Sequence, residues 1–138
     1  MTDCIDHLLH MELMLAPEHP VALPTRLSYR RRDPFAVHVT FHTETHGPVV
    51  WVFARDLLAH GMHEPSGEGD VRVRPSGRGA DAMLHLSLSS PHGHARLRTS
   101  LPALADWLRL TYLLVPAGRE GDELDLDTEL SRLLYGAA

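Results

Sequence analysis

Three residue types are missing from this chain of 138 residues, which has no lysine, no asparagine and no glutamine. All 13 basic residues are therefore arginines, and we attribute the bias to a GC-rich genome because the codons of the missing residues are rich in A and T. The basic residues are outnumbered by 18 acidic ones, which gives a formal net charge of −5. This balance argues against a nucleic-acid-binding protein, because phosphate binding needs a positive surface.

Cysteine is almost as scarce, since Cys4 stands alone. It can form neither an internal disulfide nor a thiolate cage for zinc or iron–sulfur, which fits a reducing compartment. The most apolar run, residues 49–54, is far shorter than the roughly 20 residues that cross a bilayer. The first residues place acids and histidines where a signal peptide needs a basic start and an apolar stretch. We expect a cytoplasmic protein that reaches membranes only through partners.

The remaining composition is that of an ordinary globular chain, with 43% hydrophobic and 22% charged residues. A chain of roughly 150 residues buries about 68–70% of the surface that its unfolded form exposes, so a real core is available. Neither an internal repeat nor a linker divides the sequence. We predict one domain over residues 1–138.

Two-residue alternation of apolar and polar side chains, the pattern of half-buried strands, recurs along the chain. It covers residues 9–15, 37–41, 71–74, 84–88 and 95–98, and a short apolar run at 49–53 reads as a buried strand. Gly47 and Pro48 lie between two of these segments and predict a hairpin. The prolines of residues 17–24 are expected to break the first strand.

Two segments carry helical signals instead. Residues 54–60 are expected to form a short helix with Leu57 and Leu58 on one side, Arg55 and Asp56 on the other, and Gly61 as a left-handed cap. A loop over residues 64–69 follows it.

Residues 101–115 have the helical period, with Ser100 as N-cap. Trp107, Leu110 and Leu114 widen the apolar stripe, so part of this helix is expected to face another subunit. After a polar connection at 116–123, a final helix capped by Asp125 or Asp127 is expected to end near residue 135. We therefore predict an α+β domain whose antiparallel strands form two small sheets, with a short helix between them and helices at the C-terminus.

Eleven histidines raise the question of a metal site. His38 and His42 share a strand face but lie about 13 Å apart at ~3.3 Å per residue, too far to bind one ion. His60 and His63 are separated by the end of a helix and lack a carboxylate partner. Residues 125–129 carry alternating acids as in a calcium loop, but Leu130 stands where the loop needs glycine. We predict no metal site and explain these acids by helix capping.

Signatures of catalysis and cofactor binding are weaker still. Gly67 and Gly69 resemble half of a dinucleotide fingerprint, but Arg72 takes the place of the third glycine and a strand follows instead of a helix. The chain contains neither a Gly-x-Ser-x-Gly elbow nor a His-Glu-x-x-His helix. We predict no catalytic and no cofactor-binding residues.

Four arginines on two predicted strands, Arg72, Arg74, Arg96 and Arg98, are expected to share one exposed face. Such a face could lie along single-stranded nucleic acid, but that function also favours stacking aromatics, and none interleaves these strands. We favour a solvated or protein-facing surface.

Four segments of the chain together resemble a known family. They are residues 33–43 (DPFAVHVTFHT), 49–76 (VVWVFARDLLAHGMHEPSGEGDVRVRPS), 86–97 (LSLSSPHGHARL) and 124–134 (LDLDTELSRLL). In order and spacing, over nearly the whole chain, they resemble the SsgA-like sporulation and cell-division proteins of actinomycetes, most closely over residues 51–70.

The resemblance implies a non-enzymatic regulator of sporulation-specific septation and cell-wall remodelling, located at division septa. Its implied partners are other SsgA-like proteins and the tubulin-like division protein FtsZ, with no cofactor and no small-molecule substrate. The implied fold is similar to the whirly type, assembled as a bell-shaped homotrimer. That likeness leaves single-stranded nucleic-acid binding as the alternative function, by fold analogy alone.

The best-matching segment, residues 51–70, supplies the candidate partner-binding surface. Its exposed members are expected to be Arg55, Asp56, His60, His63 and Glu64. Its apolar members, Trp51, Phe53, Leu57 and Leu58, are expected to build core instead. The domain is expected to act as a scaffold whose trimer repeats one adhesive patch, so that weak contacts gain avidity.

Overall fold

The structure is a computed structural model that describes residues 3–16, 19–123 and 133–134. Its elements in chain order are β1 (Cys4–Ala16), β2 (His19–Arg30), β3 (Asp33–Thr43), β4 (Gly47–Ala54), α1 (Arg55–Gly61), β5 (Val71–Ser76), β6 (Met83–Ser90), β7 (Gly93–Ser100) and α2 (Leu101–Leu114). Two short 3-10 turns, η1 (Gly79–Asp81) and η2 (Glu120–Glu123), complete the described part.

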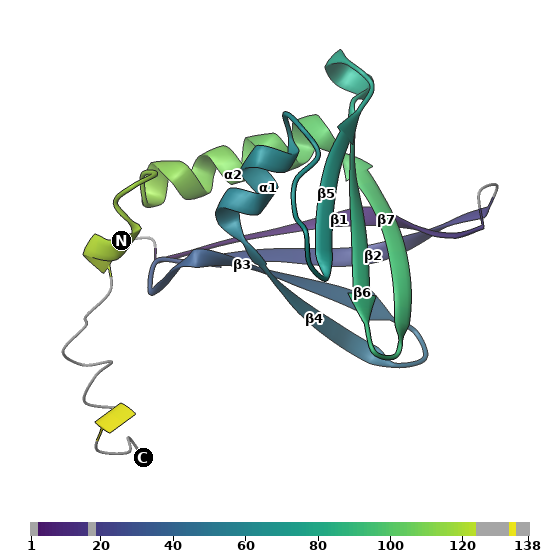
Figure 1. Ribbon diagram of the computed structural model, residues 1–138, viewed down its shortest axis with the longest axis horizontal. Coiled ribbons are helices and arrows are strands. Elements are labelled where there is room, and N and C mark those ends of the chain that lie inside the picture. The colour runs from purple at the N-terminus through teal and green to yellow at the C-terminus, as the bar shows by residue number, and fades with distance from the viewer. Residues whose placement is uncertain (1–2, 17–18, 124–132, 135–138) are drawn as a thin grey trace.

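The strands form one sheet of seven, in the order β4-β3-β2-β1-β7-β6-β5, so the prediction of two small sheets is wrong. Two groups of strands are visible in Figure 1, where β5, β6 and β7 run steeply across the direction of β1 to β4. They are joined where β1 pairs with β7, Glu12 opposite Arg98 and Leu13 opposite Leu97. Alternation reveals each strand but not its neighbours, and this short pairing between distant segments has no local signature.

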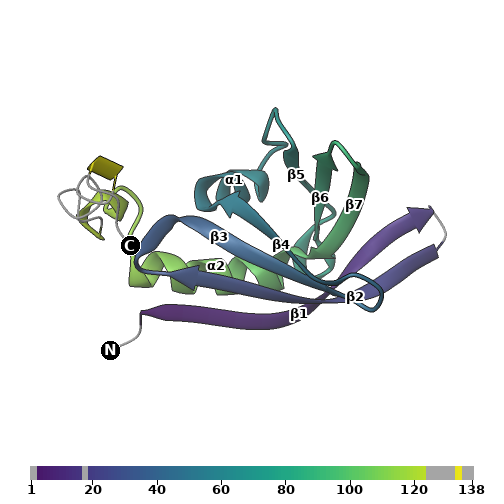
Figure 2. The same ribbon diagram turned by 90° about the horizontal axis from the view of Figure 1, so that it is seen from below.

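The expected break at residues 17–24 is also wrong for the described part of that segment, because β2 begins at His19. Pro20 pairs with Met14 and Pro24 with His10 of β1. On the other side of β2, pairing with β3 starts only at Thr25, so both prolines lie where that side of the strand has no neighbour among the described strands. A missing N–H is tolerated at such an open edge, which is why prolines did not end the strand. The resulting long β1–β2 hairpin projects beyond the rest of the molecule (Figure 2).

The core lies between one face of the sheet and the two helices. α2 packs against β1, β6 and β7, while α1 packs against β3, β4 and β5. Phe53 and Leu58 are buried, and Trp51 and Leu57 pack partly buried against the core, as predicted. Trp107, which was expected to widen the apolar stripe of α2, is buried in the same core. The hairpin predicted from Gly47 and Pro48 is formed by β3 and β4.

The helix boundaries confirm one predicted cap and correct the other. The Ser100 hydroxyl accepts a hydrogen bond from the Ala103 N–H at 3.3 Å, so Ser100 is the N-cap of α2. Gly61 is no left-handed cap: it lies inside α1, which continues to a C-cap at Met62. The glycine is explained by close packing, because a Cβ at this position would lie 2.3 Å from Val73 Cγ1 of β5. The predicted helix from Asp125 or Asp127 to residue 135 falls almost wholly outside the described residues.

Candidate partner-binding surfaces

Four of the five predicted partner-binding residues lie on the surface of α1 and of the turn that follows it, with Asp56 in the first turn of the helix and His60 in its last. Asp56, His60, His63 and Glu64 are all exposed. The backbone N–H groups of His63 and Glu64 both donate to the His60 carbonyl, at 3.0 and 3.1 Å, which turns the chain tightly after the helix. We call these four residues the α1 surface. The sequence therefore predicted the exposure of these four residues correctly.

That first member, Arg55, is buried, with a relative exposure of 1%. Its Nη1 donates to the carbonyl oxygens of Thr111 and Val115 at 3.0 and 2.9 Å. Its Nη2 donates to Glu120 Oε1 at 2.8 Å in an ion pair that is almost wholly enclosed. The prediction that Arg55 is an exposed contact residue is wrong. It fastens α1 to the last turn of α2 and to η2.

Two tyrosine rings complete this arrangement around Arg55. The guanidinium carbon lies 3.9 Å from the ring centroid of Tyr112 and 4.9 Å from that of Tyr29. At such distances the positive charge is attracted to the ring faces. The Tyr112 hydroxyl in turn donates to Asp56 Oδ1 at 3.2 Å, so a buried cluster and an exposed residue of the α1 surface are connected.

The ionisation of these groups follows from their surroundings. Burial, and then the negative charge of Asp56, raise the pKa of Tyr112 to about 12. The pKa of Glu120 is lowered by its own backbone N–H and by the hydrogen bond from Arg55. The Gly118 N–H donates to the other carboxylate oxygen of Glu120 at 2.8 Å. Glu120 is thus held as an anion facing the guanidinium.

The sequence analysis did not identify Tyr112 and Glu120 as partners of Arg55. One local signal for the burial of Arg55 itself was available. Residues three apart on a helix lie on nearly the same side, and Arg55 precedes the buried Leu58 by three positions. The helical period thus placed Arg55 on the buried side of α1, contrary to the prediction. No local signal points to Glu120, which arrives from a segment expected to be a polar connection.

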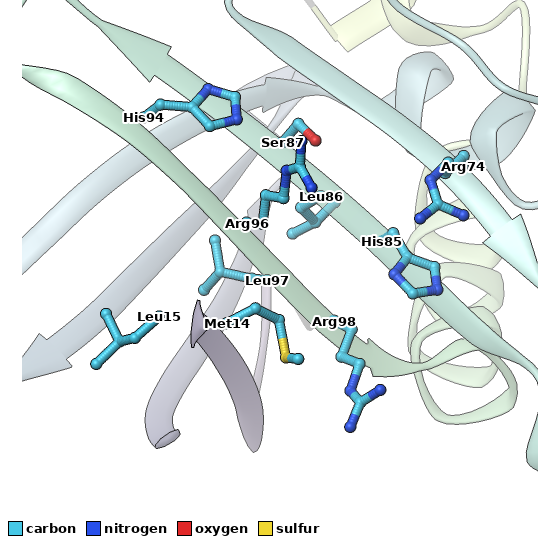
Figure 3. Close-up of a pocket in the computed structure, with 10 residues that line it drawn as sticks. All are labelled: Met14, Leu15, Arg74, His85, Leu86, Ser87, His94, Arg96, Leu97 and Arg98. Carbon is cyan, nitrogen blue, oxygen red and sulfur yellow. The ribbon is translucent and has the colours of Figure 1, made fainter. Parts of the chain in front are cut away.

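A second surface lies on the sheet face that turns away from the helices (Figure 3). Register places Arg74, His85 and Arg98 in one row across β5, β6 and β7. A second row consists of Arg72, Ser87 and Arg96. The prediction that the four arginines share one face is therefore confirmed.

Charges on this face are only partly balanced. Arg98 donates from Nε and Nη2 to Glu12 Oε2 of β1, at 3.0 and 2.8 Å. Arg72, Arg74 and Arg96 form no ion pair within the part of the chain that the structure describes. Burial, and then Arg74 and Arg98, lower the pKa of His85, whose Nε2 lies 2.7 Å from Ser76 Oγ.

Residues 3–16, 19–123 and 133–134 contain neither a metal-binding cluster nor a membrane-spanning helix. Within them, no three histidine, cysteine or acidic side chains converge on a point where a metal ion would be held. None of the described helices combines the length and the apolar character that a bilayer crossing requires.

These features define a class: a small α+β domain built on one antiparallel seven-stranded sheet, with two α-helices in its described part packed on one face. A sequence profile of the family described as "Streptomyces sporulation and cell division protein, SsgA" matches residues 23–120. The chain belongs to this SsgA family, as the resemblance predicted.

Similar proteins carry the name "Sporulation-specific cell division protein SsgB". The one from Streptomyces coelicolor is 47% identical over 126 residues, which are 91% of this chain and 92% of that protein. The one from Thermobifida fusca is 43% identical over 124 residues, 90% of each chain. Within the family, the chain is thus most like SsgB.

Solved structures agree with this assignment. A structure from a study of SsgB mutations and longitudinal cell division in Streptomyces coelicolor superposes with a TM-score of 0.82 at 43% identity, covering 87% of this chain and 94% of that one. The SsgA-like sporulation-specific cell division protein from Thermobifida fusca gives a TM-score of 0.83 at 41% identity, covering 95% and 96%.

Proposed function

We propose that this chain is a non-enzymatic regulator of sporulation-specific cell division. The observation that carries the proposal is the match to SsgB of Streptomyces coelicolor, which extends over 91% of this chain and 92% of the relative at 47% identity. The family description names sporulation and cell division and no reaction.

The activity is recruitment: the protein acts in the cytoplasm at division septa, where it gathers FtsZ and other SsgA-like proteins. The fold is of the whirly type and assembles as a bell-shaped homotrimer. The apolar side chains of α2 that this subunit leaves exposed support the trimer, because a second subunit could bury them. Leu110 is 48% exposed and Leu113 is 74% exposed. A trimer would present the same surface three times, so that weak single contacts add up on a polymeric partner.

The α1 surface is the contact region for the recruited protein. Asp56, His60, His63 and Glu64 offer hydrogen-bonding and charged groups at one place. The backbone beneath them is fixed by Arg55, because its side chain binds α1 to α2 and η2. A contact region held in one conformation loses less entropy on binding than a loose loop does.

The test of the cellular role is complementation of a Streptomyces coelicolor strain that lacks its SsgB. We expect this chain to restore sporulation septa. A strain that produces the protein at normal levels but forms no septa would contradict the proposed role. Light scattering on the purified protein tests the trimer separately, and a monomer at micromolar concentration would contradict it.

The test of the contact region is a pull-down of purified FtsZ with a triple variant, His60→Ala, His63→Ala and Glu64→Ala. These side chains are exposed, so the fold should be retained, and we expect most of the binding to be lost. The matched control is Glu44→Ala with His92→Ala, which removes similar exposed groups from turns elsewhere. Equal binding by the triple variant and the control would place the interface away from α1.

A further inference from the structure

The arginine-bearing face of β5, β6 and β7 contains an elongated groove. One hollow of about 690 Å³ includes Arg74, His85 and Arg98 in its lining. A second of about 310 Å³ reaches Ser89 and Gly69. Both are also lined by Ser87, His94 and Arg96, so they are parts of one groove that follows β6. Figure 3 shows the polar side chains of the larger hollow, including Arg74, His85 and Arg96, on the same side of the three strands.

The spacing of the arginines in this groove is set by the sheet. Arg72 and Arg74 flank it on β5, while Arg96 and Arg98 flank it on β7. Same-face residues of one strand lie about 6.6 Å apart, and β5 and β7 lie about 9.6 Å apart with β6 between them. Ser87 separates Arg72 from Arg96 with a small side chain, which leaves the centre of that row open.

One arginine that lines the groove, Arg98, already binds a carboxylate of this chain. Glu12 belongs to an extended strand, and its carboxylate receives two hydrogen bonds from Arg98, at 2.8 and 3.0 Å. The other three arginines have no such partner in the described part of the chain. A ligand that supplies more carboxylates at strand spacing would continue the same pattern of ion pairs.

We propose that this groove binds an extended acidic peptide of a partner protein, with carboxylates at alternate positions. In an extended peptide, side chains on one side also repeat about every 6.6 Å, which matches the two arginine rows. Each carboxylate would lie between an arginine of β5 and an arginine of β7. Arginine forms bidentate bonds with carboxylates, so the pairing is geometrically specific as well as electrostatic.

The same face fits nucleic acid less well. Single-strand binders stack bases on aromatic side chains, and the residues that line this groove include no tryptophan, tyrosine or phenylalanine. The chain as a whole carries a net charge of −5, which repels a long polyanion more than a short acidic segment.

The test is fluorescence anisotropy with the full-length protein and two labelled heptapeptides. One alternates aspartate with threonine, and the other, Asp-Asp-Thr-Thr-Asp-Asp-Thr, has the same composition but no two aspartates at alternate positions. We expect the alternating peptide to bind more tightly. Arg72→Gln with Arg96→Gln should weaken its binding about tenfold, the effect of losing two exposed ion pairs. Glu12→Gln should strengthen it, because Arg98 is released for the ligand.

The matched control is Arg32→Gln with Arg109→Gln, which removes the same charge from exposed positions outside the groove. If this control loses as much affinity as the groove variant, the attraction is only long-range and the proposal is wrong. It is equally wrong if the two peptides bind alike, or if a labelled ten-nucleotide oligo-dT binds more tightly than the alternating peptide at the same salt. A negative result would leave the complementation experiment unaffected, because the synthetic peptides test only this groove.

Discussion

Replacing Arg55 with methionine is the most direct test of how the α1 surface is supported. Methionine keeps an unbranched, flexible stem but removes the guanidinium. Three hydrogen bonds are lost, two to backbone carbonyls of Thr111 and Val115 and one to Glu120. The attraction to the Tyr112 ring at 3.9 Å is lost as well. α1 would then remain attached through its apolar contacts alone.

The expected cost follows from the burial of these groups. Hydrogen bonds to a charged group contribute roughly 1.5–3 kcal/mol each, but burying the guanidinium carries its own desolvation penalty, which methionine avoids. The Arg55 Nε is buried and has no hydrogen-bond partner among the described residues, which adds to that penalty. We therefore expect a net loss of about 3 kcal/mol, a large part of the 5–15 kcal/mol that is typical of a domain. For a chain of this size, the unfolding temperature should fall by roughly 10 °C.

The assay is urea and thermal unfolding followed by circular dichroism at pH 7. The matched control is Arg109→Met, because Arg109 is also an arginine on a helix but is 71% exposed, and its loss should cost under about 0.5 kcal/mol. A double variant, Arg55→Met with Glu120→Met, should be more stable than Arg55→Met alone, since no unpaired carboxylate remains. Equal unfolding midpoints for Arg55→Met and Arg109→Met would refute the reasoning.

Three further predictions concern packing, ionisation and capping. Gly61→Ala should destabilise the protein by about 1–3 kcal/mol, because its Cβ would collide with β5 at 2.3 Å, whereas Gly69→Ala meets nothing within 4 Å and should leave the unfolding midpoint unchanged. Tyr112 should ionise near pH 12 in an absorbance titration at about 295 nm. Because this pKa is raised above the ordinary 10, its contribution to stability is complete below pH 10 and is lost as the pH rises towards 12. Asp56→Asn should lower the midpoint of that titration, and an unchanged midpoint would show that Asp56 has no part in the shift. Ser100→Ala should cost about 1 kcal/mol in urea unfolding while Ser100→Asp retains the cap, and equal losses in both variants would argue against capping.

The relation between sequence and structure differs between the two surfaces. For the arginine face, the alternation of apolar and polar residues along each strand was enough to predict which side chains share a face. Successive side chains of a strand point to opposite faces of the sheet. Arg72 and Arg74 had to share one side of β5, and Arg96 and Arg98 one side of β7. The sequence could not show that Glu12 would neutralise Arg98, since these residues are 86 positions apart. For the α1 surface, four exposed residues were identified correctly and the buried one was not.

Local patterns alone determined the strands β3 to β7, the hairpin of β3 and β4, the Ser100 cap of α2 and the family of the chain. The strands, the hairpin and the cap depend on residues that are close in sequence, and the family assignment depends on the order of the matching segments along the chain. Tertiary structure alone decided that the strands form one sheet, that β2 runs through its prolines, and that Arg55 is enclosed by α2 and η2. These outcomes depend on pairings between distant segments. A charged side chain becomes a core residue only when such segments bring carbonyls, a carboxylate and aromatic rings around it. The helical period placed Arg55 on the buried side of α1, but it could not identify these partners.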